Sequence, residues 1–201
     1  MYKAYILDFG CGEGRWLEEN GGPGVIGIDL NPVFLKEARQ KAKEGTELIL
    51  CDGHRLPFKD KSFKMVNVWE VLHHMKIYRF AIKEIDRVLE GPLSLSESID
   101  NDPVFRIARR ITMNWRGIPI ESLFRSFELI AEIEKYFKID EIEYIGYLPF
   151  WHPFAQLGFR SKVITYLGRF YNILLRKFRI EKMLASCVQI QCHNNTNEAS
   201  K

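Results

Sequence analysis

The 201-residue chain lacks long hydrophobic runs, and no stretch approaches the roughly 18 uncharged apolar residues that a membrane-spanning helix requires. The N-terminus also lacks the basic-then-apolar order of a signal peptide. Both features exclude the common transmembrane and secreted classes, and we expect a cytoplasmic protein. At this length a domain buries enough surface to fold without disulfide or metal staples.

Cysteine is scarce, and its positions form neither a CxxC pair nor a cysteine–histidine zinc spacing. The four cysteines are Cys11, Cys51, Cys187 and Cys192. Isolated cysteines of this kind behave as small hydrophobic residues in a reducing compartment. No metal site is predicted.

Neither sign of charge dominates, because 29 Lys and Arg oppose 26 Asp and Glu, a formal net charge of +3. This balance argues against a surface that is basic throughout, so nucleic acid is not an expected partner. Residues 151–185 are the exception, since seven basic residues accompany one acid, Glu181. The same segment has apolar residues at helical spacing, namely Phe159, Val163, Leu167, Phe170 and Leu174, with Lys162, Arg169 and Arg176 opposite them. Two interpretations stay open, a surface helix packed on the core, and a helix that lies on a membrane surface or covers an amphiphilic substrate.

Short aliphatic runs alternate with longer amphipathic stretches, which is typical of parallel βαβ units. The pattern predicts helices at residues 32–44, capped by Asn31, and 77–89. We expect one domain over residues 1–192 with a helical insertion at about 99–136, in two pieces at 103–113 and 122–136, followed by a polar tail at 193–201. The predicted strands are residues 4–9, 24–29, 47–51, 65–69, 93–97, 139–145 and 186–191.

The strongest motif is ILDFGCGEG at residues 6–14, a strand that runs into a glycine-rich turn opening a helix. Glycines at such a turn let the backbone approach a ligand and present amide groups to it. Dinucleotide sites use GxGxxG, but here Arg15 stands where that pattern requires its last glycine. Asp8 would repel a pyrophosphate and suit a cationic group such as a sulfonium or an ammonium. A dinucleotide is therefore not the predicted ligand.

Three further motifs follow the next predicted strands. Asp29 ends the second strand in IGID and can accept hydrogen bonds from both hydroxyls of a ribose. Asp52, in CDGHRLPF, can accept from the exocyclic amine of adenine, and the fourth strand runs through Trp69 to the pair His73 and His74. All these loops lie at the carboxyl ends of neighbouring strands, where open α/β sheets bind ligands. A helix-initiating Asp29, an Asp52 that only shapes a turn, and purely structural histidines remain alternatives.

These four ordered motifs resemble those of the class I S-adenosylmethionine-dependent methyltransferases, within the small-molecule group related to the quinone-biosynthesis enzymes. The resemblance extends from Ala4 to Gln191. It implies an α/β, Rossmann-like, doubly wound sheet of seven strands in the order 3-2-1-4-5-7-6, with only the last-numbered strand antiparallel. It also implies S-adenosyl-L-methionine as the cofactor.

The same resemblance assigns cofactor contacts residue by residue. It implies a methionine subsite at Asp8, Gly10, Cys11 and Gly12, a ribose contact at Asp29, and an adenine subsite at Leu30, Asp52, Gly53 and the Trp69 carbonyl. His73 or His74 would act as a general base if the acceptor is a hydroxyl or an acidic carbon.

Two features depart from the family pattern. Relatives carry helices before the first strand, whereas here Asp8 follows Met1 almost at once. We therefore expect the N-terminal helices to be missing, and the site to be open or closed by another chain, as in a homodimer. The LKPGG turn of relatives is replaced by Leu89-Glu90-Gly91-Pro92, which predicts a shorter fifth strand.

The expected function is methyl transfer to a small acceptor, hydrophobic or lipid-like, with membrane-surface contact through residues 151–185. Two alternatives stay open. The chain could be a catalytically idle cofactor-binding subunit that a partner completes, or it could methylate RNA or protein, for which the Arg-rich insertion around Arg109, Arg110 and Arg116 is the support.

Overall fold

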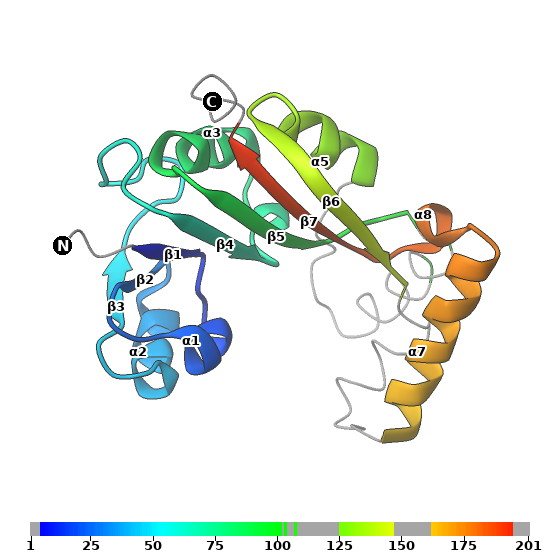
Figure 1. The fold of residues 1–201 in the computed structure, drawn as a ribbon. Helices are drawn as coiled ribbons and strands as arrows, with labels where there is room; N and C mark the ends of the chain where they lie inside the picture. Colours follow the sequence, from blue (N-terminus) through cyan, green and yellow to red (C-terminus); the bar gives the residue numbers. More distant parts are fainter. Residues whose placement is uncertain (1–4, 102, 104–106, 108–124, 147–161, 195–201) are drawn as a thin grey trace. The chain divides into compact units, whose positions relative to one another are not determined.

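The computed structural model describes residues 5–101, 103, 107, 125–146 and 162–194. The chain divides into two compact units (Figure 1). Unit 1 comprises residues 1–96, 131–141 and 190–201, and unit 2 comprises residues 97–130 and 142–189. The predicted helical piece at 103–113, the arginines of the insertion and Phe159 lie outside the described residues, apart from positions 103 and 107.

Seven strands form one sheet in the order β3-β2-β1-β4-β5-β7-β6, which confirms the predicted order. The strands are β1 (Ile6–Phe9), β2 (Val25–Asp29), β3 (Glu47–Leu50), β4 (Met65–Trp69), β5 (Pro92–Ser98), β6 (Phe137–Ile145) and β7 (Cys187–Asn194). Strands β1 to β5 pair in parallel wherever they are neighbours.

Strand β7 runs against β5. The Ile99 amide donates to the Ser186 carbonyl at 2.9 Å, and Gln191 Nε2 donates to Ser94 Oγ at 2.8 Å. Residue numbers thus rise along one strand as they fall along the other, and the sheet is mixed.

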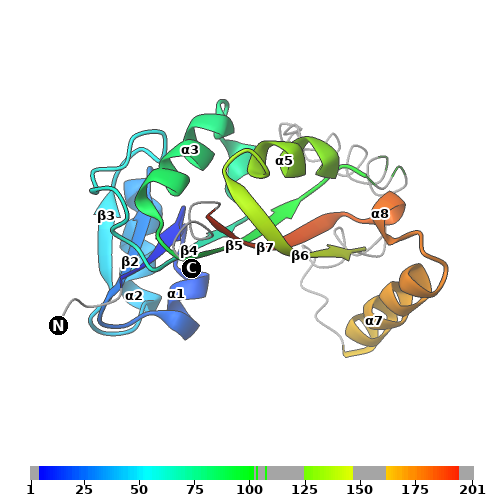
Figure 2. The ribbon, with the colours of Figure 1, turned by 45° about the horizontal axis from the view of Figure 1, so that its top comes forward.

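Helices cover both faces of the parallel strands in unit 1. Figures 1 and 2 show α1 (Arg15–Asn20) and α2 (Pro32–Lys41) on one face and α3 (Tyr78–Val88) on the other. Because both faces are covered, the central strands are apolar almost throughout, and Leu7, Val66 and Val68 have no exposed surface. The chain also contains the 3-10 turn η1 (Leu72–His74) and the helices α5 (Ser126–Ile133), α7 (Lys162–Lys177) and α8 (Glu181–Leu184).

The structure corrects several predicted boundaries. The fifth strand, β5, has seven residues and extends one residue beyond each end of the predicted strand at 93–97. The turn before β5 brings Gly91 against the backbone of Lys64, because a Cβ on Gly91 would lie 2.1 Å from the Lys64 carbonyl oxygen. Helix α2 ends at Lys41 rather than at residue 44, because the Lys43 amide bonds to the Leu17 carbonyl and Gly45 takes a φ of +86°.

The polar tail begins later than predicted. His193 and Asn194 belong to β7. The side-chain Nδ2 of Asn194 donates to the Leu89 carbonyl at 2.9 Å, and His193 Nδ1 lies 2.9 Å from Asp140 Oδ2. These side chains extend the strand because they find partners on neighbouring elements, which their polarity alone does not indicate.

Candidate functional site

A cleft of about 830 Å³ opens in unit 1 where β1, β2, β3 and β4 end. Ten of the residues named from the sequence line it together: Asp8, Gly10, Cys11, Gly12, Asp29, Leu30, Asp52, Gly53, Trp69 and His74. His73, also described, does not line the cleft and is half-buried, whereas His74 is exposed. The four loops therefore meet at one site, and the two histidines differ in their access to it.

Asp8 is a buried carboxylate, with 3% of its surface exposed. The parallel register places it beside Asn67 of β4, whose Nδ2 donates to Asp8 Oδ1 at 2.7 Å. The second oxygen, Oδ2, is buried and has no hydrogen-bond partner among the described residues. Burial raises the pKa of Asp8 to about 7, while the bond from Asn67 opposes the rise and the charge of Asp29 adds to it. A cation reaching Oδ2 would supply the partner that this oxygen lacks.

The glycine turn combines left-handed backbone with close packing. Gly10, Gly12 and Gly14 have φ of +71°, +50° and +81°. A Cβ on Gly10 would lie 2.5 Å from Val71 Cγ1, and one on Gly14 would lie 2.8 Å from Ala38 Cα in helix α2. A Cβ on Gly12 would meet no atom of the described chain within 4 Å. Gly10 and Gly14 thus set the turn, while Gly12 leaves space at the cleft wall.

Asp29 joins the turn to helix α2. Its Oδ2 accepts the Gly12 amide at 2.9 Å, and its Oδ1 accepts the Asn31 amide at 2.8 Å. A carboxylate has about four lone-pair sites, so two hydrogen bonds leave it able to accept two more. Asp29 is half-buried and lines the cleft, which suits a ligand that brings two neighbouring hydroxyls.

Replacing Asp29 by Ala should therefore weaken binding of a ribose-containing ligand by roughly 1 to 3 kcal/mol, because its hydroxyls would lose their partner in a partly buried site. Isothermal titration measures the change. Asn31→Ala is the matched control, since Asn31 caps α2 by accepting the Val33 amide at 2.9 Å. Loss of that cap should lower stability by about 1 kcal/mol and leave affinity unaltered. Equal affinities of the Asp29 variant and the native chain would remove the ribose assignment.

Asp52 is held by its neighbour His54, for which the sequence predicts no role in the site. One oxygen of Asp52, Oδ1, accepts from the His54 amide at 2.9 Å and lies 2.7 Å from His54 Nδ1. These bonds lower the pKa of Asp52, which stays ionised and available as an acceptor. Gly53 is required by packing, since a Cβ there would lie 2.4 Å from the ring of Phe9.

Cys11 serves the fold of the turn. Its amide donates to the Ile28 carbonyl at 2.8 Å, and its side chain belongs to a buried cluster with Leu17 and Val25. Burial and the nearby carboxylates Asp8 and Asp29 raise the pKa of the Cys11 thiol far above its ordinary range. The thiol is therefore neutral and a poor nucleophile.

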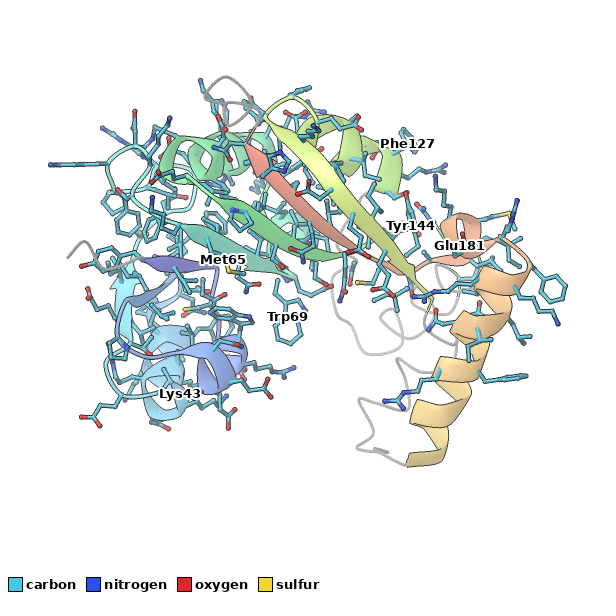
Figure 3. All side chains as sticks on the ribbon, viewed as in Figure 1. Lys43, Met65, Trp69, Phe127, Tyr144 and Glu181 are labelled. Carbon is cyan, nitrogen blue, oxygen red and sulfur yellow. The ribbon has the colours of Figure 1, made fainter. Side chains whose placement is uncertain are left out.

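The end of β4 forms the opposite side of the cleft. Trp69 is 46% exposed and projects beyond the carboxyl end of the strand (Figure 3). Glu70 follows with a φ of +56°, rare for a residue with a side chain, and its amide donates to the Ser96 carbonyl at 2.8 Å. This bend directs the chain into η1, where the rings of His73 and His74 have centroids 4.0 Å apart.

Several lining residues were not predicted from the sequence. They are mostly apolar or aromatic and include Trp16, Phe34, Val71 and Met75, together with Lys76. Helical spacing could have placed Phe34 near the start of α2, whereas the contribution of η1 depends on the bend at Glu70. In the described residues, no group of His, Cys, Asp and Glu could hold a metal ion, and no helix has the length and apolar character needed to span a bilayer.

Comparison with known proteins identifies the family. Residues 7–91 match the family described as a methyltransferase domain. Residues 7–91 are a class I methyltransferase domain. This domain contains the glycine turn, Asp29, Asp52 and both histidines, so the family match and the cleft coincide.

Two curated relatives are similar to part of this chain. A probable tRNA methyltransferase 9B of Bos taurus is 36% identical over 87 residues, 42% of this chain and 18% of that protein. A demethylmenaquinone methyltransferase of Staphylococcus aureus strain JH9 is 36% identical over 110 residues, 50% of this chain and 46% of that protein. The chain thus spans about half the length of the second relative and under a fifth of the first.

Solved structures share the fold at low identity. The [4+2]-cyclase SpnF has a TM-score of 0.65 and 17% identity, covering 95% of this chain and 75% of that one. A chain from the complex of the Haloferax volcanii Trm112 methyltransferase activator with a putative methyltransferase has a TM-score of 0.62 and 18% identity, covering 96% and 82%. At this identity the likeness concerns the fold alone.

S-adenosylmethionine is the cofactor of this class of domain, and the cleft fits it. The unpartnered Oδ2 of Asp8 suits the ammonium of its methionine part. The remaining acceptor sites of Asp29 suit the ribose hydroxyls of the cofactor. The open space beside Gly12 leaves room for the cofactor to approach the backbone of the glycine turn. The fit rests on one charged, one polar and one steric feature, all on the described residues of unit 1.

Proposed function

We propose that the chain transfers a methyl group from S-adenosylmethionine to a small, hydrophobic or lipid-like acceptor. The observation that carries this proposal is the buried, unpartnered oxygen of Asp8 at the wall of the cleft, beside the glycine turn and Asp29. A buried carboxylate with one free oxygen is costly to keep ionised, and a cationic ligand removes that cost.

The cofactor supplies an electrophilic methyl group when bound. The residues of this chain position it: Asp8 would bind the ammonium, Asp29 the ribose hydroxyls, and Asp52 the adenine amine, with Leu30 against the adenine face. The Trp69 carbonyl and Gly53 complete the adenine side. Most of the rate of methyl transfer can come from proximity, alignment and exclusion of water, which a shaped cleft provides.

The apolar wall of the cleft favours a hydrophobic acceptor. Trp69 and Phe34 line it and are 46% and 40% exposed, and the half-buried Met75 also lines it. Apolar side chains that line a ligand site bind apolar groups, and few polar groups are needed to orient them. The similarity to a demethylmenaquinone methyltransferase supports the same acceptor class.

His74 is the better candidate for a general base, because it lines the cleft and is exposed, whereas His73 does neither. Each ring packs against the other at 4.0 Å, so His73 would support the orientation of His74. A base is needed only for an acceptor that must lose a proton, such as a hydroxyl or an acidic carbon.

A second candidate function is methylation of tRNA, which the similarity over 87 residues to a probable tRNA methyltransferase 9B supports. The third hypothesis is a catalytically idle subunit that is completed by a partner or by a second copy in a homodimer. The experiment below distinguishes it from the other two.

The test is methyl transfer by the purified chain, with demethylmenaquinol and bulk tRNA as separate acceptors and labelled S-adenosylmethionine as donor. We expect label in the quinol, and a loss of about 10²- to 10⁴-fold in kcat for His74→Ala, the range of general acid–base catalysis. His73→Ala is the matched control and should lose much less. Label in tRNA alone would favour the second function, and label in neither acceptor, with cofactor bound, would favour the idle subunit.

A further inference from the structure

Helix α7 of unit 2 turns an apolar and basic face to solvent. Phe170 and Ile173 are 59% and 62% exposed, one helical turn apart. Arg169 and Lys177 are also exposed and lie within four residues of Ile173, so all four share one side of the helix. The sequence pattern groups Phe170 with an apolar face that either packs on the core or lies on a membrane surface, and the structure leaves Phe170 exposed.

The orientation of this helix is fixed by its opposite side. Leu175 is 3% exposed, and Asn172 forms two hydrogen bonds with the backbone of Gly146, at 2.8 and 3.0 Å. At the edge of the exposed side, Arg176 forms an ion pair with Glu143. These contacts leave Phe170 and Ile173 no route to the core of unit 2 without breaking them.

The exposed surface continues past the end of α7. Phe178 and Met183 are 64% and 59% exposed, and Arg179 and Lys182 are exposed beside them. Figure 3 labels Glu181 at the start of α8, directly after this turn. Between residues 169 and 183 the exposed charged side chains are all basic, namely Arg169, Arg176, Lys177, Arg179 and Lys182. Of these, Arg176 is paired with Glu143.

Arg179 occupies a position that glycine usually takes. Its φ is +56°, and the Ile180 amide donates to the Leu175 carbonyl at 3.0 Å, which is the closing bond of a Schellman C-cap. A non-glycine residue is strained in this conformation. Retaining an arginine here is consistent with a role for its charge.

We propose that this α7–α8 surface, made of the exposed residues between 169 and 183, binds an anionic membrane surface. Aromatic and aliphatic side chains flanked by Lys and Arg are the composition of helices that lie in the headgroup region, where long basic side chains reach the phosphates. A protein partner would need a strongly acidic complementary face, because the exposed charged side chains here are all basic. The proposal concerns unit 2 alone and does not depend on the proposed methyl transfer.

The test is co-sedimentation of the full chain with vesicles of phosphatidylcholine containing about 30% phosphatidylglycerol. We expect enrichment on these vesicles at low salt and little on pure phosphatidylcholine. The bound protein should be released as salt rises toward 0.5 M, because the Debye length shortens to about 4 Å near that ionic strength. Phe170→Ser with Ile173→Ser should abolish enrichment. Phe80→Ser, at a residue of α3 that is 56% exposed, is the matched control and should bind as the native chain does.

A charge variant tests the electrostatic part without removing apolar surface. Arg179→Gly should lower vesicle affinity about five-fold, the value for one basic residue near an anionic surface, and should not lower the thermal midpoint. No enrichment on anionic vesicles, equal binding to neutral ones, or enrichment that survives the Phe170 and Ile173 changes would overturn the proposal. So would self-association or tRNA binding through these residues without vesicle binding. Cofactor affinity of every variant should stay unchanged, which separates this result from the fate of the proposed function.

Discussion

Replacing Asp8 by Asn is expected to stabilise the ligand-free protein at pH 8 and to weaken S-adenosylmethionine binding by about 10- to 100-fold. The affinity falls because a hydrogen bond to a charged group contributes roughly 1.5 to 3 kcal/mol. The fold is kept because the side-chain oxygen of the new asparagine can still accept the bond that Asn67 donates at 2.7 Å to Oδ1 of Asp8. One substitution thus separates the role of this carboxylate in binding from its cost in the empty protein.

The gain in stability has a defined pH dependence. Burial raises the pKa of Asp8 from 3.8 to about 7, so between these values the folded state holds a proton that the unfolded state has released. Stability of the native chain therefore falls as pH rises from about 4 to 7, by at most about 4 kcal/mol at 1.36 kcal/mol per unit. The Asn variant lacks this loss, so the two chains should be similar at pH 4 and differ most at pH 8.

Thermal or urea unfolding at both pH values measures the difference, and titration with S-adenosylmethionine measures the affinity. Asp52→Asn is the matched control, because Asp52 is an exposed carboxylate of the same cleft whose pKa is lowered rather than raised. It should not raise stability at pH 8. An Asp8 variant that binds the cofactor as well as the native chain would contradict the assigned role.

Gly14→Ala is expected to act mainly on stability, whereas Gly12→Ala is expected to act mainly on cofactor binding. Gly14→Ala should destabilise the fold by about 2 to 5 kcal/mol, the sum of left-handed strain and overpacking against Ala38 at 2.8 Å. Gly12→Ala should cost only the strain of about 1 to 2 kcal/mol. The new methyl group of Gly12→Ala stands in the cleft, so the variant should lose cofactor affinity while it stays folded.

Urea unfolding and titration of both variants provide the comparison. Each variant is the control for the other, because both place the same methyl group on a left-handed residue of one turn. A Gly12 variant that is as unstable as the Gly14 variant, or that binds the cofactor normally, would show that the space beside Gly12 is not part of the ligand site.

The parallel part of the fold could be predicted because local and global requirements agree there. The run at β1 is apolar because helices cover both faces of the sheet, and the cap at Asn31 accepts the Val33 amide as its sequence position indicates. Strand ends that depend on side-chain partners, such as His193 and Asn194 in β7, could not be predicted from polarity. Their partners, Asp140 and Leu89, are far away in the sequence.

The candidate site was predicted as far as it lies in short motifs. Asp8 lies one residue before the end of β1, Asp29 ends β2 and Asp52 follows β3, so sheet geometry alone brings them to one edge of the sheet. The partner Asn67 depends on strand register, and the difference between His73 and His74 depends on the bend at Glu70. Exposure of Phe170 depends on which side of α7 is anchored, and helical period cannot decide between two amphipathic faces.

The most direct test of the central claim is titration of the purified chain with S-adenosylhomocysteine, with NADH as the comparison ligand. The cleft should bind S-adenosylhomocysteine and raise the thermal midpoint, by the equivalent of about 2.7 kcal/mol at one hundred times its Kd. The Asp8→Asn and Asp29→Ala variants should lose most of this shift, and NADH should give none. A shift with NADH and none with S-adenosylhomocysteine would contradict the account.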